Sequence, residues 1–399
     1  MYQGKQIAVI GAGIVGLAVA YKLSLQNAKL TVFEKETQEG MHQSGRNSGV
    51  LHCGLYYQPG SLKAKLSVEG IREMIAFANE NNISHDVCGK VVVATSEKER
   101  KSLEKLAQRG HENGLSGLSY LDNSALKKRE PFVRAQKALL VPEEGIIDYK
   151  GVMRVLVQKI KENNGTVYFS TPIKSIKEES TKEVQIKIED KVLLFDYVIV
   201  CGGLWSDTCF RQMTKQKSPL KIVPFRGEYL KFKTGFEDHV NHLIYPVPDV
   251  QFPFLGVHFT RMIDGSREVG PNAVLALKRD GYLRNSFSLK DTYDILTFPG
   301  LFRFVAQNFR FSINEFKSSL FMKDFIAKAQ KMIPEVDESM LERGPAGVRA
   351  QAISSDGILL MDFNIISKGR QVHVLNAPSP GATASLAIAS HIIENYLPN

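Results

Sequence analysis

The stretch QIAVIGAGIVG at residues 6–16 decides the fold of this chain. Residues 6–10 form a β-branched, apolar run of the kind found in buried parallel strands. A G-x-G-x-x-G motif follows directly, at Gly11, Gly13 and Gly16. The first glycine permits a tight turn, the second lets backbone approach a diphosphate, and the third lets a helix pack closely on the strand. The stretch therefore predicts the opening of a dinucleotide-binding fold.

The next residues complete a βαβ unit. A helix is predicted over 17–26, and the apolar run 30–33 is predicted as a second strand that ends at Glu34. The helix N-terminus presents unpaired N–H groups and a positive dipole end to phosphate. Glu34, 18 residues beyond Gly16, can accept hydrogen bonds from both ribose hydroxyls and would repel a 2′-phosphate. The alternative is a similar fold whose glycine turn holds no ligand.

A polar, glycine-rich segment, EGMHQSGRNSGVLH at residues 39–52, decides between dinucleotides. An NAD-binding domain usually continues with another βαβ unit, whereas this segment can wrap an extended cofactor. Its hydroxyl and amide side chains can bond phosphate oxygens. The cofactor-binding residues predicted here are Lys35, Ser44, Asn47, Ser48 and Gly49. An NAD dehydrogenase remains an alternative.

The composition is that of an ordinary globular enzyme. The chain has 399 residues, 43% hydrophobic and 23% charged, which predicts two or three domains at roughly 150 residues each. Its net charge of +9 favours anionic partners. The Lys and Arg residues are scattered and form no nucleic-acid-binding motif, so we expect no nucleic acid partner.

Cysteine spacing and hydropathy indicate a cytoplasmic protein. The four cysteines form no C-x-x-C pair, which fits reduced thiols and predicts neither a metal site nor a disulfide framework. The longest uncharged apolar stretch, residues 7–20, has 14 residues. A membrane-spanning helix needs roughly 20, so no spanning segment is predicted.

The N-terminal layout resembles the D-amino-acid-oxidase-like branch of FAD-dependent oxidoreductases. Narrower signals elsewhere resemble L-2-hydroxyglutarate dehydrogenases, also described as oxidases, and together they span nearly the whole chain. These blocks are residues 48–57, 224–229, 242–248, 254–261, 270–273, 344–349 and 376–383.

The resemblance implies an α/β fold. It consists of a Rossmann-like FAD-binding domain of the glutathione-reductase type and a substrate domain with a mixed, mainly antiparallel sheet plus helices. We predict a discontinuous FAD domain at residues 1–84, 145–215 and 340–399, and a substrate domain at residues 85–144 and 216–339. No internal repeat is visible.

Further cofactor contacts are expected from three segments. Residues 195–206 predict a buried strand and a glycine turn beneath the adenosine half, and Ile173 resembles a family position that touches adenine through backbone. Both segments can equally be strand ends alone. In the family, the N-terminus of a C-terminal helix, predicted here over 382–396, points at the flavin pyrimidine edge and stabilises reduced flavin; an ordinary terminal helix is the alternative. The residues concerned are Ile173, Gly202, Gly203, Trp205, Gly381, Ala382 and Thr383.

The implied reaction is oxidation of L-2-hydroxyglutarate to 2-oxoglutarate, with hydride transfer from C2 to flavin N5 and loss of the hydroxyl proton. Histidine is the usual base near neutral pH. We prefer His258, near Arg261 at the end of a predicted strand, over the alternative of a structural core histidine. For His52 we expect a role facing flavin or substrate, while some relatives of the superfamily link a histidine here covalently to flavin.

A dicarboxylate substrate calls for guanidinium groups, which pair with carboxylates in bidentate fashion. The candidates are Arg226, Arg261 and Arg349, with Tyr245 as a further donor. Arg349 is the first choice for the 1-carboxylate because it lies near the C-terminal cofactor segments. Surface or interdomain ion pairs are the alternative for each arginine.

Residues 282–325 are unusually aromatic, with eleven aromatic side chains in 44 positions. Phe302, Phe304, Phe309 and Phe311 are interspersed with Arg303 and Arg310, a mixture expected at an anionic lipid surface. A lid packed on the substrate domain is the alternative.

In the resembling bacterial enzymes, membrane quinone accepts the electrons. This resemblance suggests a protein that binds peripherally to the inner face of the cell membrane. An amine oxidase of the glycine or sarcosine oxidase type and a nonenzymatic dinucleotide-binding protein remain competing functions.

Overall fold

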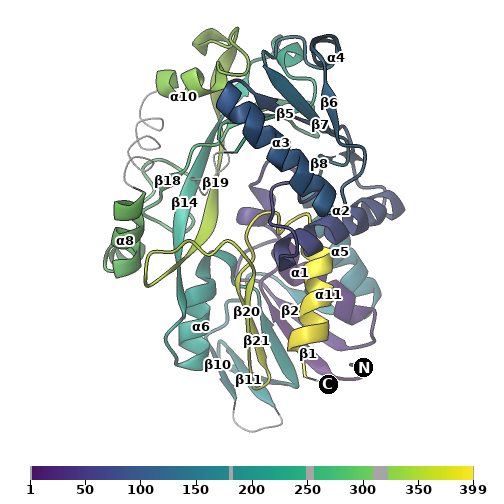
Figure 1. Ribbon diagram of the computed structural model, residues 1–399. Helices are drawn as coiled ribbons and strands as arrows, with labels where there is room; N and C mark the ends of the chain where they lie inside the picture. Colours follow the sequence, from purple (N-terminus) through teal and green to yellow (C-terminus); the bar gives the residue numbers. More distant parts are fainter. Residues whose placement is uncertain (1, 179–182, 249–255, 309–321, 399) are drawn as a thin grey trace.

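The computed structural model describes residues 2–178, 183–248, 256–308 and 322–398. A six-stranded sheet and a nine-stranded sheet form its two halves, drawn below and above the middle of Figure 1. The chain crosses between them several times. Both termini lie beside β1 at the lower end.

The six-stranded sheet contains the opening βαβ unit. Its strands run parallel, except that β20 and β21 are antiparallel. The predicted strands over 6–10 and 30–33 are confirmed, because β-branched runs suit a sheet that is covered on both faces. In spatial order the strands are β20 (Asn364–Lys368), β21 (Gln371–Asn376), β13 (Tyr197–Val200), β1 (Gln6–Ile10), β2 (Lys29–Phe33) and β9 (Thr166–Tyr168).

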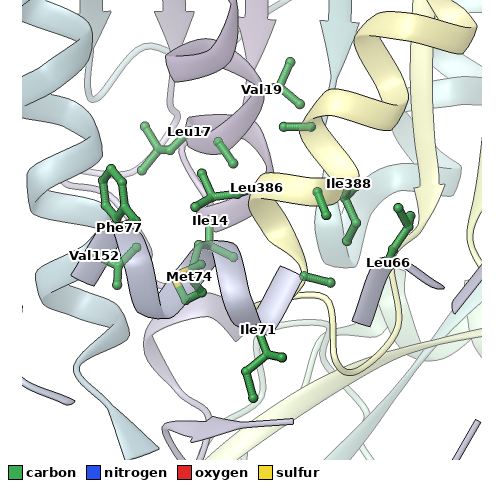
Figure 2. Close-up of a cluster of buried hydrophobic side chains, with 14 of the residues drawn as sticks. Ile14, Leu17, Val19, Leu66, Ile71, Met74, Phe77, Val152, Leu386 and Ile388 are labelled. Carbon is green, nitrogen blue, oxygen red and sulfur yellow. The ribbon is translucent and has the colours of Figure 1, made fainter. Parts of the chain in front are cut away.

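Helices cover one face of this sheet, and Figure 2 shows their apolar contacts. The helices are α1 (Ile14–Ser24), α2 (Leu62–Glu80), α5 (Tyr149–Glu162) and α11 (Ser385–Tyr396). Side chains drawn there include Ile14 and Leu17 of α1, Met74 and Phe77 of α2, Val152 of α5, and Leu386 and Ile388 of α11. The opposite face packs on a small antiparallel sheet of β10 (Ser175–Glu178), β11 (Val184–Ile188) and β12 (Lys191–Phe195).

Two helix starts differ from the sequence-based prediction. The first helix begins at Ile14 rather than at residue 17, because Gly13 already occupies its N-cap in extended conformation. The last begins at Ser385 rather than at residue 382. Residues just before it form turns instead, with the N–H of Gly381 donating to Pro378 and that of Ala384 to Pro380.

The nine-stranded sheet is antiparallel except where β15 runs parallel to β5. This mixed, mainly antiparallel sheet confirms the predicted fold class. Its strands in order are β18 (Val274–Leu275), β14 (Leu220–Phe232), β17 (Arg267–Gly270), β16 (His258–Arg261), β15 (Leu243–Pro246), β5 (Lys90–Ala94), β7 (Lys137–Val141) and β6 (Ser119–Leu121), with β19 (Leu341–Ser354) also paired to β14.

Shorter elements complete the described structure. A three-stranded sheet of β3 (Val50–Leu51), β8 (Gly145–Ile147) and β4 (His85–Asp86) lies where the chain passes between the halves. The remaining helices are α3 (Glu97–Glu112), α4 (Asn123–Arg129), α6 (Ser206–Thr214), α7 (Leu289–Leu296), α8 (Pro299–Gln307) and α10 (Met322–Ala329). The 3₁₀ turns are η1 (Gln43–Gly45), η2 (Gly203–Trp205), η3 (Glu237–His239) and η4 (Glu338–Met340).

The domain boundaries stay a prediction. All six strands of the first sheet come from the three segments assigned to the FAD domain. The segment from residue 340, however, opens with β19, which pairs with β14 of the other sheet. Sheet membership therefore favours a boundary beyond Ser354. None of the helices in the described ranges combines the length and apolar character needed to cross a bilayer.

Candidate functional site

The glycine turn after β1 leaves no room for side chains. Gly11 has a φ of +101°, and a Cβ there would lie 2.4 Å from the carbonyl oxygen of Cys201. A Cβ on Gly16 would lie 2.0 Å from the carbonyl oxygen of Gly11. At Gly13 the nearest atom to such a Cβ would be the Ser44 hydroxyl oxygen, at 3.2 Å. The turn is thus closed toward the sheet and lined by a hydroxyl beside Gly13.

Ser44 lies at the N-terminus of α1. Its hydroxyl oxygen accepts a hydrogen bond from the N–H of Ile14, the first residue of that helix, at 3.0 Å. The first N–H groups of a helix suit phosphate because no helical carbonyl satisfies them. The glycines, the helix end and Ser44 therefore fit a diphosphate.

Glu34 ends β2 beside the same turn. One carboxylate oxygen accepts the N–H of Ala12 at 2.7 Å, and the other accepts the N–H of Glu36 at 2.9 Å. These bonds hold the carboxylate against the glycine turn. Each oxygen keeps a second lone pair, so Glu34 can still accept ribose hydroxyls.

Lys35 belongs to an aromatic and cationic cluster next to Glu34. Its ammonium lies 4.0 Å from the centre of the Trp205 ring. His42 packs edge-on against Trp205, and its Nδ1 lies 2.8 Å from the Tyr282 hydroxyl. Arg46 stacks over Tyr282 at 3.9 Å. Sequence reasoning missed His42 and Tyr282, which bring the 277–288 segment onto the predicted cofactor loop.

The predicted loop residues after Ser44 divide into two roles. The Asn47 side chain accepts the N–H of Gly49 at 2.9 Å and donates to the carbonyl of Ser44 at 2.8 Å, so it shapes the loop. Gly49 has a φ of +65°, which favours glycine. Ser48 is hydrogen-bonded to Tyr229 of the nine-stranded sheet, so it connects the loop to the other half.

Gly202 and Gly203 form the turn after β13. The carbonyl of Gly202 accepts the N–H of Trp205, and a Cβ on Gly203 would lie 3.3 Å from the Gln43 amide nitrogen. This turn therefore abuts the cofactor loop. The Ile173 side chain packs against the core beneath the six-stranded sheet, and the adenine contact predicted for its backbone stays a prediction.

The turn before α11 is tied to the loop at His52. The Thr383 hydroxyl accepts the N–H of His52 at 3.2 Å and lies 2.7 Å from the Tyr149 hydroxyl. The Gly381 N–H is used within its turn, while those of Ala382 and Thr383 donate to no acceptor in the described ranges. These two N–H groups remain candidates for a cofactor contact.

Four predicted or newly found side chains converge where β3 meets one face of the nine-stranded sheet. The Tyr245 and His258 rings stack with their centres 4.0 Å apart, as expected of neighbours on antiparallel strands. The His52 ring lies 6.4 Å from the Tyr245 ring. Lys90, at the start of β5, places its ammonium 4.9 Å from the Tyr245 ring centre. We call His52, Lys90, Tyr245 and His258 the histidine cluster.

His258 is buried and neutral at pH 7. Its Nδ1 lies 2.9 Å from the carbonyl oxygen of Gly256, which leaves the lone pair on Nε2 when Nδ1 carries the proton. Burial, and then the nearby charge of Arg349, lower the pKa of His258 to about 3. Arg349 is also hydrogen-bonded to Tyr229. The fold therefore brings His258, His52, Tyr245 and Arg349 together.

A buried ion pair completes this region. Glu144 lies 2.7 Å from the Lys90 ammonium and 3.5 Å from Nδ1 of His52, and neither charged partner of the pair is exposed. Burial alone would raise the pKa of Glu144, but Lys90 and His52 lower it to about 2. Sequence reasoning missed both residues; a lysine opening the buried run KVVVA at residues 90–94 was the available signal.

Two predicted arginines lie elsewhere. Arg261 forms an ion pair with Asp86, and it stands three residues from His258 on β16, so the two side chains leave opposite faces of the sheet. Arg226 is buried and donates to Glu228 at 3.0 Å. These contacts match the ion-pair alternative for both arginines.

In the aromatic segment, residues 282–325, some of the apolar side chains are exposed. Phe304 and Phe325 are buried, so the segment is partly packed on the substrate half. Phe309, Phe311, Phe316 and Phe321 lie outside the described residues. The exposed apolar side chains, here called the apolar surface, are Leu283, Phe287, Leu289, Tyr293, Leu296 and Phe302.

A family model described as "FAD dependent oxidoreductase" matches residues 6–395. A relative from Indibacter alkaliphilus, named L-2-hydroxyglutarate dehydrogenase, is 42% identical over 98% of both chains. The mitochondrial protein of that name from Homo sapiens is 41% identical over 97% of this chain and 88% of its own length.

A solved structure of L-alpha-glycerophosphate oxidase from Mycoplasma pneumoniae with FAD bound has a similar fold. Its TM-score is 0.78 at 22% sequence identity, and the match covers 98% of this chain and 94% of that one. Together with the dinucleotide turn, these comparisons establish that the chain belongs to the L-2-hydroxyglutarate dehydrogenase family of FAD-dependent oxidoreductases and is an enzyme with FAD as its cofactor.

Proposed function

We propose that the protein oxidises L-2-hydroxyglutarate to 2-oxoglutarate. The observation that carries this proposal is the convergence of two histidines and Arg349 on one face of the nine-stranded sheet. Relatives about 40% identical over nearly the full chain carry the name of this activity. When bound, FAD supplies the electron acceptor, taking hydride from C2 of the substrate.

Arg349 binds the 1-carboxylate of the substrate in this proposal. A guanidinium can hold a carboxylate through two parallel hydrogen bonds. Tyr229 is hydrogen-bonded to Arg349 and helps to orient the guanidinium. The Tyr245 hydroxyl adds a donor: burial raises its pKa, so it stays protonated at neutral pH. Arg226 and Arg261 take no part, since each is paired elsewhere.

His52 takes the hydroxyl proton. An imidazolium forms when a histidine accepts this proton, so the charges around the ring decide which histidine suits the role. Arg349 and Lys90 oppose a positive charge on His258, whereas His52 lies beside the Glu144 carboxylate. The proposal thus reverses the sequence-based preference for His258, which instead stacks on Tyr245 and keeps it in place.

A substrate panel tests this function. Purified FAD-loaded enzyme is assayed with a soluble dye acceptor and L-2-hydroxyglutarate, its D enantiomer, glycine or sarcosine. Fast turnover with the L enantiomer alone supports the proposal. Turnover with glycine or sarcosine identifies an amine oxidase, and no turnover with any of these substrates contradicts the proposal.

In the second part of the proposal, the electrons pass to membrane quinone. The enzyme docks on the inner face of the cell membrane through the apolar surface. Lys290 and Arg303 lie within the same stretch and suit anionic lipid. A pocket of about 250 Å³ next to it is lined by Leu283, Phe325 and Tyr229, which links the surface to Arg349.

Vesicle flotation tests this docking. The enzyme is mixed with vesicles containing anionic lipid or with neutral vesicles, at low salt. Binding to anionic vesicles, with faster reduction of an incorporated quinone than of a quinone held in detergent, supports the proposal. An enzyme that stays entirely in the soluble fraction contradicts it.

A further inference from the structure

The buried carboxylate of Glu144 lies next to His52 of the histidine cluster. Oε2 of Glu144 lies 3.5 Å from His52 Nδ1, and Glu144 exposes none of its surface. Within the described part of the chain this oxygen has no hydrogen-bond partner of good geometry. The Lys90 ammonium lies 2.7 Å from this oxygen, and the second lone pair still calls for a donor, because a buried polar group without its partners is costly. An N–H on His52 Nδ1 is placed to satisfy it, and catalytic hydrogen bonds are often long before substrate binds.

Glu144 is held in place independently of His52. Its Oε1 lies 3.4 Å from the backbone N–H of Cys53 and 3.3 Å from the Cys53 sulfur. On the other side the Lys90 ammonium lies 2.7 Å from Oε2. This ammonium also lies 4.3 Å from the Tyr56 ring centre, so it is held between the Glu144 carboxylate and the Tyr56 ring. The carboxylate is therefore both charged and fixed.

We infer that Glu144 is a positioning residue for His52, and that Lys90 is the counter-ion that keeps Glu144 ionised and oriented. His52 Nδ1–H donates to Glu144, which leaves the Nε2 lone pair for the substrate. As the substrate O–H bond breaks, its proton moves to Nε2, and the two electrons of the C2–H bond leave with the hydride. The carboxylate stabilises the imidazolium that forms. This inference rests on the proposed function, which gives His52 a proton to accept.

The Glu144→Gln variant tests the inference by kinetics. We expect kcat with L-2-hydroxyglutarate to fall at least about 10-fold, because a positioned base contributes 10²- to 10⁴-fold to rate. KM should stay within about twofold, since Glu144 does not touch the substrate. The acid limb of the kcat/KM profile should move to lower pH because the imidazolium loses its carboxylate.

Glu143→Gln is the matched control. Glu143 is the preceding residue, and its carboxylate accepts the N–H of Ser116 and lies 3.9 Å from Arg72, away from the histidine cluster. The pH profile of kcat/KM in Glu143→Gln should match that of the natural protein. Full kcat and an unmoved profile in Glu144→Gln would overturn the inference, as would equal losses in both variants.

The tautomer of His52 gives a second readout that needs no turnover. In ¹⁵N-histidine-labelled holoenzyme above pH 8, NMR should show His52 protonated at Nδ1, with its signal assigned from its loss in His52→Gln. The Glu144→Gln variant should show more of the Nε2–H form. A natural protein whose His52 carries its proton on Nε2 contradicts the inference. If L-2-hydroxyglutarate is not turned over, the proposed function fails while this measurement still decides the positioning.

A double variant guards against loss of folding. Glu144→Gln alone leaves the Lys90 ammonium buried without its counter-ion, and breaking a buried pair destabilises far more than replacing both partners. Lys90→Met combined with Glu144→Gln removes both buried charges of this pair. This folded double variant should reproduce the fall in kcat and the shifted tautomer. Natural kcat and an unchanged His52 tautomer would contradict the inference.

Discussion

The two halves of the molecule hold their functional groups in different ways. Around the six-stranded sheet, the turn, helix end and carboxylate come from one continuous segment, between Gly11 and Ser44. On the nine-stranded sheet, the histidine cluster draws single residues from β5, β15 and β16 and from the loop after β3. The first arrangement is local and recognisable as a motif, whereas the second exists only once the sheet has formed.

The largest effect should come from adding a side chain at Gly16, in the glycine turn after β1. In Gly16→Ala, the new Cβ would lie 2.0 Å from the backbone oxygen of Gly11, which cannot move away easily. Such overpacking costs about 3 kcal/mol or more, so FAD affinity should fall by about 100-fold or the protein should purify without colour. Gly60→Ala is the control: Gly60 has a φ of +79° and a Cβ there meets no atom within 4 Å, so it strains the backbone without a clash. Equal FAD affinity in both variants, measured by fluorescence titration, would break the comparison.

The second-largest effect should come from replacing Arg349 in the substrate half. Lys cannot reproduce bidentate pairing, so Arg349→Lys should lower kcat/KM for L-2-hydroxyglutarate by about 30- to 100-fold, or about 2–3 kcal/mol. FAD binding should not change. Arg261→Lys is the matched control, because the Arg261 side chain leaves β16 on the opposite face from His258 and is paired with Asp86. If the two variants show the same kinetics, Arg349 does not bind the substrate.

The third effect is a pH-dependent loss of stability on the substrate half. His258 has a folded-state pKa of about 3, against about 6.5 when unfolded. Between these values the unfolded chain binds a proton that the folded chain does not, so stability falls as pH drops below 6.5. The slope from His258 should reach about 1.4 kcal/mol per pH unit.

Thermal unfolding followed from pH 7 to pH 4 measures this slope. It should be shallower in His258→Gln than in the natural protein. A control replaces His111, which is exposed on α3. A slope that is equally steep in all three proteins would show that His258 is not the source.

The smallest effect concerns the apolar surface. Each exposed apolar side chain there can bury area in lipid worth about 1.5–3 kcal/mol at full burial. Leu289→Ser should therefore weaken binding to anionic vesicles by about 10-fold while turnover with a soluble acceptor is kept. Leu194→Ser, on the exposed β12 strand of the small sheet beneath the six-stranded sheet, is the control. Equal binding by both variants would place the membrane contact elsewhere.

The sequence predicted the cofactor half well because its physics is local. The strand, glycine turn and helix over residues 6–24 follow from short-range sterics and pattern, and Glu34 follows from the end of β2. The errors were at helix starts, where N-cap geometry at Gly13 and the turns before Ser385 decide the first residue.

The substrate half was predicted only in part. Without the resemblance, nothing local marks His258 or Arg349, which meet through strand pairing and burial. Arg261 looked equivalent to them, yet the alternation of side chains along β16 directs it to the other face. Lys90 and Glu144 meet only when β5 packs beside the turn before β8, so no spacing in the sequence reveals their ion pair.

The most direct test is an anaerobic titration of the purified, FAD-loaded enzyme with L-2-hydroxyglutarate, followed by absorbance and by analysis of the product. The proposed function predicts that the oxidised flavin spectrum is lost in proportion to added substrate, with one 2-oxoglutarate formed for each flavin reduced. A flavin that stays oxidised with L-2-hydroxyglutarate, but is reduced by dithionite, would contradict it.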